Sequence, residues 1–315
     1  MLRYFFSRLL SLGLSLIVAS LAIFFVIEII PGDPASFMLG LNASPEAVAA
    51  LKAELGLTGS PISRYFSWVG GLFFGDLGIS YTYRTPVSEL VLDRIKVSLP
   101  LAIYALVLST AIAFPVGILS ATKRGRFLDY SVMGATQMGI AVPNFWFAML
   151  LVLFFAIWLG WFPAGGFSGW KQGFYPAIKS LTLPAIALAL TQASILARVM
   201  RSALIEVLDQ DYIRTARAKG LSQRRVVIRH ALRNALIPVL TILGLQFSFL
   251  LAGAIIIENV FFLPGLGRLI FQGITQRDLI VVESVVMLLV FTVIMVNFCV
   301  DIAYAIVDPR LRKKR

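Results

Sequence analysis

Long stretches without a charged residue dominate this sequence, and each is long enough to cross a lipid bilayer. A transmembrane helix needs about 20 mostly apolar residues, because the hydrocarbon core is about 30 Å thick and a helix rises about 1.5 Å per residue. The six stretches that meet this requirement are Leu9–Ile27, Val97–Thr122, Ser131 to about Gly160, Ser180–Ala197, Ala235–Ile257 and Ser284–Val300. The sequence therefore predicts an all-α, polytopic membrane protein with six transmembrane helices.

Two of these stretches allow another interpretation. The first, which follows two arginines, has the order of charges of a signal peptide, but it is too long for the usual apolar region and no convincing cleavage site follows it, so we expect a retained helix. The uncharged region Ser131–Trp170 is long enough for two spans. Its end, Trp161–Trp170, is rich in aromatic residues and glycine and is typical of an interfacial turn. We therefore expect a single span there, kinked at Pro143 and Asn144.

The composition excludes several functional classes. Of the 315 residues, 59% are hydrophobic and only 14% are charged, against about 25% charged in soluble proteins. The net charge of +12 comes from basic residues at the ends of apolar stretches, which indicates anionic lipid and membrane orientation rather than nucleic acid. The single cysteine and the single histidine provide neither an intrachain disulfide nor a metal cluster. No phosphate-binding G-x-x-x-x-G-K-[ST] motif occurs, so the sequence has no P-loop to bind nucleotide phosphates.

The basic residues are distributed unevenly between alternate loops. With both termini in the cytoplasm, 19 of the 28 basic residues lie inside and nine lie outside. Five of those nine belong to the long first loop, where the positive-inside rule loses force. We therefore expect both termini to be cytoplasmic.

The outer loop between the first two spans carries three helix-start signals. A serine or threonine followed by proline, as in Ser44-Pro45, Ser60-Pro61 and Thr85-Pro86, is typical of an N-cap and first helical residue, and Gly56 is typical of a helix stop. We expect short amphipathic helices against the outer membrane surface. Packing over the helix bundle is favoured for them, and the docking of a partner is the alternative.

The segment between the fourth and fifth spans, Asp211–Pro238, is strongly basic. Its first part predicts a short helix, capped by Asp211 and stopped by a left-handed Gly220. A second helix is predicted to start at Ser222 and to run continuously into the fifth span. It places Arg225, Arg229 and Arg233 opposite Val227, Ala231 and Ala235. Lipid headgroups would explain the second helix, whereas the first helix and its turn suit the docking of a cytosolic partner.

Five segments resemble one known family. They are IPGDPA at Ile30–Ala35, GDLGIS at Gly75–Ser80, YIRTARAKGLSQRRVVIRHALRNALIPV at Tyr212–Val239, ENVFFLPGLGRLI at Glu258–Ile270 and VDIAYAIVDPRLR at Val300–Arg312. Together they resemble the permease subunits of bacterial ABC importers for dipeptides, oligopeptides and nickel, the binding-protein-dependent transport system inner membrane components. The matches lie at both ends and in the middle, so the resemblance covers nearly the whole chain.

The resemblance implies a type I ABC importer permease fold in the bacterial inner membrane and a subunit that is not an enzyme. No cofactor is expected on this chain, because ATP and Mg would be bound by partner subunits. The implied partners are a second, homologous permease in a heterodimer, two ATP-binding subunits, an extracytoplasmic solute-binding protein and membrane lipid, but no nucleic acid. In the family, the basic loop holds a helix that docks in a groove of the ATP-hydrolysing subunit, and its glycine matches Gly220. The wider family pattern has Glu-Ala-Ala where this chain has Arg214, Thr215 and Ala216, and Pro where it has Arg233.

Three groups of candidate site residues follow. The ATPase-docking loop comprises Arg214, Thr215, Ala216, Arg217, Ala218, Lys219, Gly220, Leu221, Ser222 and Arg225. The loop of an outer gate comprises Pro264, Gly265, Gly267 and Arg268, whose glycines allow a tight re-entrant turn, an ordinary connection being the alternative. Neutral amides within the spans are Asn144, Gln192, Gln246 and Asn297, for which interhelical hydrogen bonds are favoured over contact with the translocation path. No metal site is expected.

The chain is expected to divide into four parts. Residues 1–30 hold the first span, 31–96 the periplasmic loop, 97–306 a five-helix permease core with the coupling loop 200–236, and 307–315 a basic cytoplasmic tail. The expected function is the translocation of peptides or related small solutes, such as nickel chelates or glutathione, by alternating access. The alternatives are a secondary carrier or channel without an ATPase, and a scaffold that does not transport. Carboxylates such as Glu28 and Glu258 lie near the ends of the apolar stretches, so a mid-membrane coupling site has little support.

Overall fold

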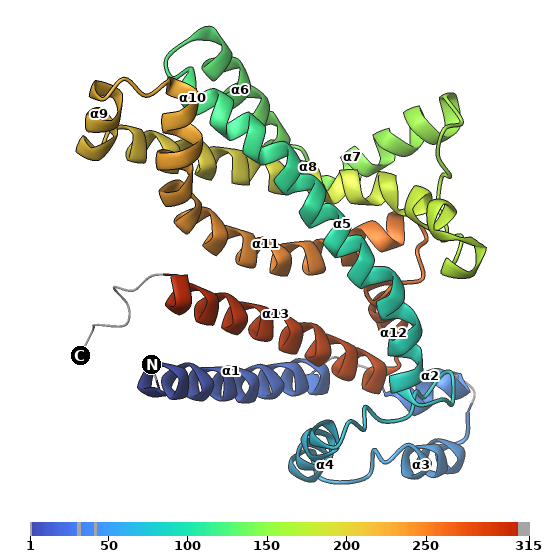
Figure 1. Ribbon diagram of the computed structural model, residues 1–315. Helices are drawn as coiled ribbons and strands as arrows, with labels where there is room; N and C mark the ends of the chain where they lie inside the picture. Colours follow the sequence, from blue (N-terminus) through green and yellow to red (C-terminus); the bar gives the residue numbers. More distant parts are fainter. Residues whose placement is uncertain (1, 30–32, 41–42, 308–315) are drawn as a thin grey trace. The chain divides into compact units, whose positions relative to one another are not determined.

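A computed structural model describes residues 2–29, 33–40 and 43–307 (Figure 1). Apart from one isolated β-bridge between Ile79 and Pro86, the regular structure of these residues is helical, which confirms the predicted all-α class. The described residues form two compact units, one within the ranges 1–98 and 264–298 and the other within the ranges 99–263 and 299–307. The first is called unit 1 and the second unit 2. The residues 30–32 that open the predicted outer loop, and the tail from residue 308 onward, lie outside the described residues.

Unit 1 contains the N-terminal helix, the helices of the outer loop and two later helices. Its elements are α1 (Leu2–Ile29), α2 (Pro34–Leu39), α3 (Pro45–Glu54), α4 (Pro61–Phe73), the start of α5 (Val87–Thr122), α12 (Leu266–Thr275) and α13 (Leu279–Val307) as far as residue 298. Two predicted caps are confirmed, since the hydroxyls of Ser44 and Ser60 each accept a backbone N–H at 3.2 Å. The third is not, because the buried hydroxyl of Thr85 has no hydrogen-bond partner although α5 begins two residues later.

Asp278, just before α13, anchors the loop that carries the GDLGIS segment. Its carboxylate accepts hydrogen bonds from the Ser80 hydroxyl and from the backbone N–H groups of Tyr81 and Thr82, at 3.1 and 3.0 Å. Gly78 in this loop has φ +82° and lies against the side chain of Ile280, so the segment needs glycine both for its backbone conformation and for space.

Unit 2 is built around one long helix. Its elements are the rest of α5, α6 (Phe127–Ala141), α7 (Asn144–Leu151), the π-helix η1 (Val152–Trp158), the 3-10 turn η2 (Trp170–Gln172), α8 (Phe174–Leu208), α9 (Asp211–Ala218), α10 (Gln223–Arg225), the π-helix η3 (Val226–Ala231) and α11 (Leu232–Val260). Helix α8 packs against α6, α7 and α11. In its apolar part 72% of the residues are buried, so α8 forms the centre of the unit.

The predicted spans are confirmed with one correction. Five helices are long and apolar enough to cross a membrane: Phe5–Ile29, Val87–Thr122, Phe174–Leu208, Gln223–Val260 and Leu279–Val300. The remaining predicted span is a pair of helices, α6 and α7–η1, joined at Pro143 with a bend of 99°. This is a broken or re-entrant span rather than the expected kink, because Pro143 cannot continue the hydrogen-bonding pattern of α6.

The boundary between unit 1 and unit 2 lies between residues 98 and 99, two residues after the expected start of the permease core at residue 97. Helix α5 crosses this boundary, since it begins at Val87 and runs through the charged residues before Val97. Residues 264–298, expected within the core, group with the N-terminal part.

Candidate functional site

The predicted docking segment folds as a short helix with a sharp end. Asp211 was expected to be the N-cap of this helix. In the structure Gln210 is the N-cap and Asp211 is the first residue of α9, so the helix begins one residue earlier. At the other end Gly220 has φ +80°, its N–H bonds to the carbonyl of Arg217 and the N–H of Leu221 bonds to that of Ala216. This is the Schellman arrangement, in which a left-handed glycine satisfies the last carbonyl groups of a helix. The predicted glycine stop is confirmed.

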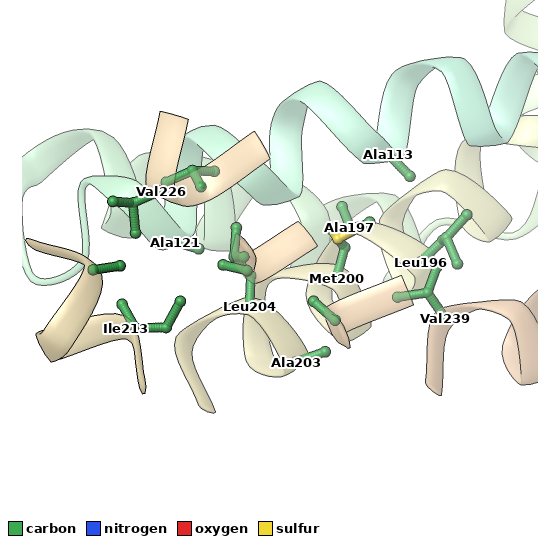
Figure 2. Packing of buried hydrophobic residues seen from close by; sticks show 14 residues of the cluster. Ala113, Ala121, Leu196, Ala197, Met200, Ala203, Leu204, Ile213, Val226 and Val239 are labelled. Atoms are coloured by element: carbon green, nitrogen blue, oxygen red, sulfur yellow. The ribbon is translucent and has the colours of Figure 1, made fainter. Parts of the chain in front are cut away.

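A buried hydrophobic cluster holds α9 in place (Figure 2). Ile213 of α9 is fully buried, and Figure 2 places it beside Leu204 of α8 and near Val226 of η3 and Ala121 of α5. A hydrogen bond of 2.7 Å from Asn234 of α11 to the Tyr212 hydroxyl adds a direct polar link. Burial of an aliphatic side chain of this size stabilises by about 1.5–3 kcal/mol, so α9 is fixed to its neighbouring helices rather than loosely tethered.

Most of the predicted docking residues lie on the opposite face of this segment. Eight of the ten are exposed: Arg214, Thr215, Arg217, Ala218, Lys219, Gly220, Ser222 and Arg225. Leu221 is half-buried, and Ala216 is only 8% exposed because it packs into the cluster. Ala216 was predicted to be one of the docking residues, but the structure places it in the hydrophobic core.

The connection from α9 to the fifth span is helical but not uniformly α-helical. Three residues of α10 are followed by the π-helix η3 and then by α11. The predicted faces are confirmed: Arg225, Arg229 and Arg233 are exposed, whereas Val227, Ala231 and Ala235 are buried. The predicted continuous helix is confirmed, since Gln223–Val260 is one helical span that follows the N-cap Ser222, and η3 is a π-helical part within it. Such segments are rare and frequently lie at functional sites.

An ion pair that sequence patterns do not reveal ties three segments of unit 2 together. Asp129 of α6 is buried, and its two carboxylate oxygens accept hydrogen bonds from Nε and Nη2 of Arg201 in α8, each at 2.7 Å. The same carboxylate accepts hydrogen bonds from the Ser120 hydroxyl of α5 and from the N–H of Gly125, the latter at 3.0 Å. Two aligned charged hydrogen bonds form one of the stronger contacts available to a protein. The pair fixes the α5–α6 turn to the helix that leads into α9.

Two of the four candidate amides form the interhelical hydrogen bonds that were expected. The side-chain oxygen of Asn144 accepts a hydrogen bond of 2.6 Å from Thr191, and the side-chain nitrogen of Gln246 donates one of 2.7 Å to the backbone oxygen of Gln192. The side-chain oxygens of Gln192 and Gln246 are buried without a partner. Asn297 is half-buried in unit 1.

The segment with the expected outer-gate loop is the start of a helix. Gly265 is the extended N-cap residue of α12, and Pro264 precedes it. Gly267 is buried and Arg268 is half-buried in the first turn, and the N–H of Leu266 donates a hydrogen bond of 2.7 Å to the Ser98 hydroxyl. The left-handed residue at this corner is Phe262, with φ +52°, and neither glycine has a positive φ. The expected glycine turn is therefore corrected to a capped, amphipathic helix.

Among the described residues no group of three or more His, Cys, Asp or Glu side chains is arranged to hold a metal ion.

Two family profiles match the chain over nearly its whole length. The profile described as "Binding-protein-dependent transport system inner membrane component" matches residues 113–313, and its N-terminal counterpart matches residues 1–102. The chain belongs to this permease family. The first match includes α9 and the segments on both sides of it, so the segment predicted to dock a partner lies within the shared family region.

Named members of the family are similar along the full chain. A Brucella abortus chain with a provisional name as a peptide transport system permease protein is 42% identical over 94% of this chain and 95% of its own length. The dipeptide transport system permease protein DppB of Escherichia coli K12 and the glutathione transport system permease protein GsiC of Salmonella choleraesuis are each 38% identical, with complete coverage of both chains.

A solved structure of the methionine ABC transporter MetNI in an inward-facing conformation shares the fold. A chain of that structure aligns with a TM-score of 0.59 at 21% identity, over 70% of this chain and 96% of its own length. This similarity confirms the predicted permease fold for the 70% of this chain that aligns.

Proposed function

We propose that this chain is one of two membrane-spanning subunits of an ATP-driven importer that carries peptides or related small solutes across the bacterial inner membrane. Family membership and the names of the similar chains, which refer to peptides, dipeptides and glutathione, support this substrate class. The observation that carries the proposal is α9: its inner face is fixed by a buried cluster and its outer face presents exposed basic and small residues.

In the proposed complex α9 docks on an ATP-binding subunit, and a second permease, a second ATP-binding subunit and an extracytoplasmic solute-binding protein complete the importer. ATP and Mg bind to the partner subunits. Both termini lie in the cytoplasm, which the excess of basic residues in the corresponding loops supports. This orientation puts the helices α2, α3 and α4 on the outer side.

Closure of the ATP-binding subunits would move α9 and, through it, the spans. The buried cluster joins α9 to α5, α8 and η3, so a displacement of α9 is passed to several helices at once. Driving a two-state equilibrium from 1:99 to 99:1 takes about 5.5 kcal/mol of differential binding. A loosely attached helix would lose this energy in local movement, whereas the cluster and the Tyr212–Asn234 hydrogen bond make α9 a stiff connection.

Cysteine cross-linking tests the docking face. Cys299 is exposed and is first replaced by serine. Single cysteines at Thr215 and Ala218 are then expected to cross-link to a co-expressed ATP-binding subunit, in a manner that changes when ATP is added. A cysteine at Ala216 is the matched control, because this position lies on the same helix but faces the core. Absence of an ATP-sensitive cross-link at both exposed positions contradicts the docking. Uptake by the purified chain alone, without ATP or partners, would instead favour a self-contained carrier.

A further inference from the structure

Unit 1 contains a cavity of about 280 Å³ that the proposed transport cycle does not use. Five segments form its wall: the end of α1, the turn between α3 and α4, α4 itself, the loop of residues 76–81 and the start of α13. Pockets for drug-sized ligands have volumes of about 300–1,000 Å³. This cavity is therefore of a size for a small polar group rather than for a large molecule.

The cavity wall carries more negative than positive side chains. Three carboxylates, those of Glu28, Asp76 and Glu283, face one guanidinium, that of Arg64. Arg64 donates a hydrogen bond of 2.6 Å to Glu28 and forms an ion pair with it. Asp76 accepts a hydrogen bond of 2.8 Å from the N–H of Gly78 in its own loop. These two contacts leave Glu283 as the remaining acid of the wall.

Glu283 accepts no hydrogen bond and forms no ion pair among the described residues, although it is only 9% exposed. Arg64 attracts its negative charge, but that guanidinium is already bonded to Glu28. Burying a carboxylate without a partner is costly, so buried acids are normally paired or hydrogen-bonded. A cation that enters the cavity would supply the missing partner.

Aromatic side chains form the other part of the wall. Trp68 is buried, its ring stacks on Phe24 with centroids 6.4 Å apart, and its Nε1 donates a hydrogen bond of 3.4 Å to Ser284. Tyr81 lines the same cavity. The face of an aromatic ring attracts cations, and tryptophan does so most strongly. Carboxylate and aromatic groups therefore favour the same kind of ligand.

We propose that this cavity binds a primary ammonium group, with Glu283 as its counter-ion and Trp68 and Tyr81 as its aromatic walls. Such a group is carried by the amino terminus of a small peptide and by the headgroup of phosphatidylethanolamine. The proposal concerns binding by this chain and does not depend on coupling to an ATPase.

Calorimetry on the full-length chain in phosphatidylglycerol nanodiscs tests the site, with butylammonium as the probe. Saturable binding is expected, and Glu283→Gln is expected to weaken it at least about tenfold, because it removes the charge while keeping the size of the side chain. Glu54→Gln is the matched control, since Glu54 is an exposed acid of the same unit, paired with Arg84 and outside the cavity. Trp68→Phe, which leaves all three carboxylates in place, is expected to weaken binding by a smaller factor. Equal affinity of wild type and Glu283→Gln, or no saturable binding, overturns the proposal.

Competition distinguishes the two sources of the ammonium group. If the ligand is a peptide, the dipeptide Ala-Ala displaces butylammonium and N-acetyl-Ala-Ala does not. If it is a lipid, phosphatidylethanolamine in the nanodisc weakens butylammonium binding and the dipeptide has no effect. Binding of butylammonium that neither competitor reduces contradicts the proposal, because the cavity then accepts the probe alone.

Discussion

Replacing Asp129 by asparagine should destabilise unit 2, because asparagine keeps the shape of the carboxylate but only one acceptor oxygen. If that oxygen stays with Arg201 Nε and the Ser120 hydroxyl, the new NH₂ group faces Arg201 Nη2 and the N–H of Gly125, which are both donors. A hydrogen bond to a charged group contributes about 1.5–3 kcal/mol, and a buried donor left without a partner costs about 1–3 kcal/mol.

The expected loss is about 3 kcal/mol. This lies at the lower end of the 3–5 kcal/mol typical for a broken buried ion pair, because the Arg201 side chain is 24% exposed and water can replace part of its contact. A domain of this size changes its melting midpoint by about 2–4 °C per kcal/mol, so the midpoint should fall by about 6–12 °C.

Thermal unfolding of the purified chain in detergent measures this shift, followed by far-ultraviolet circular dichroism. Asp209→Asn is the control: its ion pair with Arg124 lies at the same end of α8, but both side chains are more than half exposed, so a loss within about 1 kcal/mol is expected. If Asp129→Asn melts within 2 °C of Asp209→Asn, the ion pair does not contribute as described.

Further predictions concern glycines and one tyrosine. Gly220→Val forces a β-branched residue to adopt φ +80° at a cost above about 1–2 kcal/mol and should lower ATP-driven uptake. Gly40→Val, with comparable strain at φ +83° in unit 1 and outside the cavity, should spare coupling, so equal uptake by both variants contradicts this prediction. Gly117→Ala places a methyl group 2.8 Å from a backbone oxygen of α8 and should cost about 1–3 kcal/mol in thermal unfolding, whereas Gly134→Ala meets no atom within 4 Å and should be neutral or stabilising. Burial, with the negative charges of Glu283 and Asp278, raises the pKa of Tyr81 to about 12. The folded chain then holds a proton that the unfolded chain loses near pH 10, so this contribution to stability is complete below pH 10 and declines as the pH rises from about 10 to 12. Tyr81→Phe should flatten the decline in unfolding experiments across this range, and an unchanged slope argues against the shift.

The sequence predicts the elements that follow from local patterns. The spans are recognisable because about 20 uncharged residues have few alternatives, and the end of α9 is recognisable because Gly220 follows a helix-forming segment. The exposed arginines of the η3–α11 segment follow from their spacing and from the buried alanines on the opposite face. These features depend on neighbours within one or two helical turns.

Features that depend on distant residues are not predictable in this way. Asp129 and Arg201 are 72 positions apart, and nothing near either residue indicates the other. Asp278 looks like a loop residue, although it is fully buried and binds a loop almost 200 positions earlier. The segment after Pro264 was expected to be a turn because it contains two glycines, but Leu266, Leu269 and Ile270 bury one face and favour a helix.

The π-helix η3 also changes how the exposed arginines are arranged along the helix. In an α-helix four residues advance by about 400°, so a side chain repeated at every fourth position drifts sideways by about 40° per step. A π-helix bonds each residue to the fifth along the chain and takes more residues per turn, so the same four-residue step falls short of a full turn instead of exceeding it. Arg229 lies inside η3, between Arg225 and Arg233. The wider turn therefore counteracts the drift and brings the guanidinium groups closer to a straight column, although their sequence spacing alone would make them spiral around the helix.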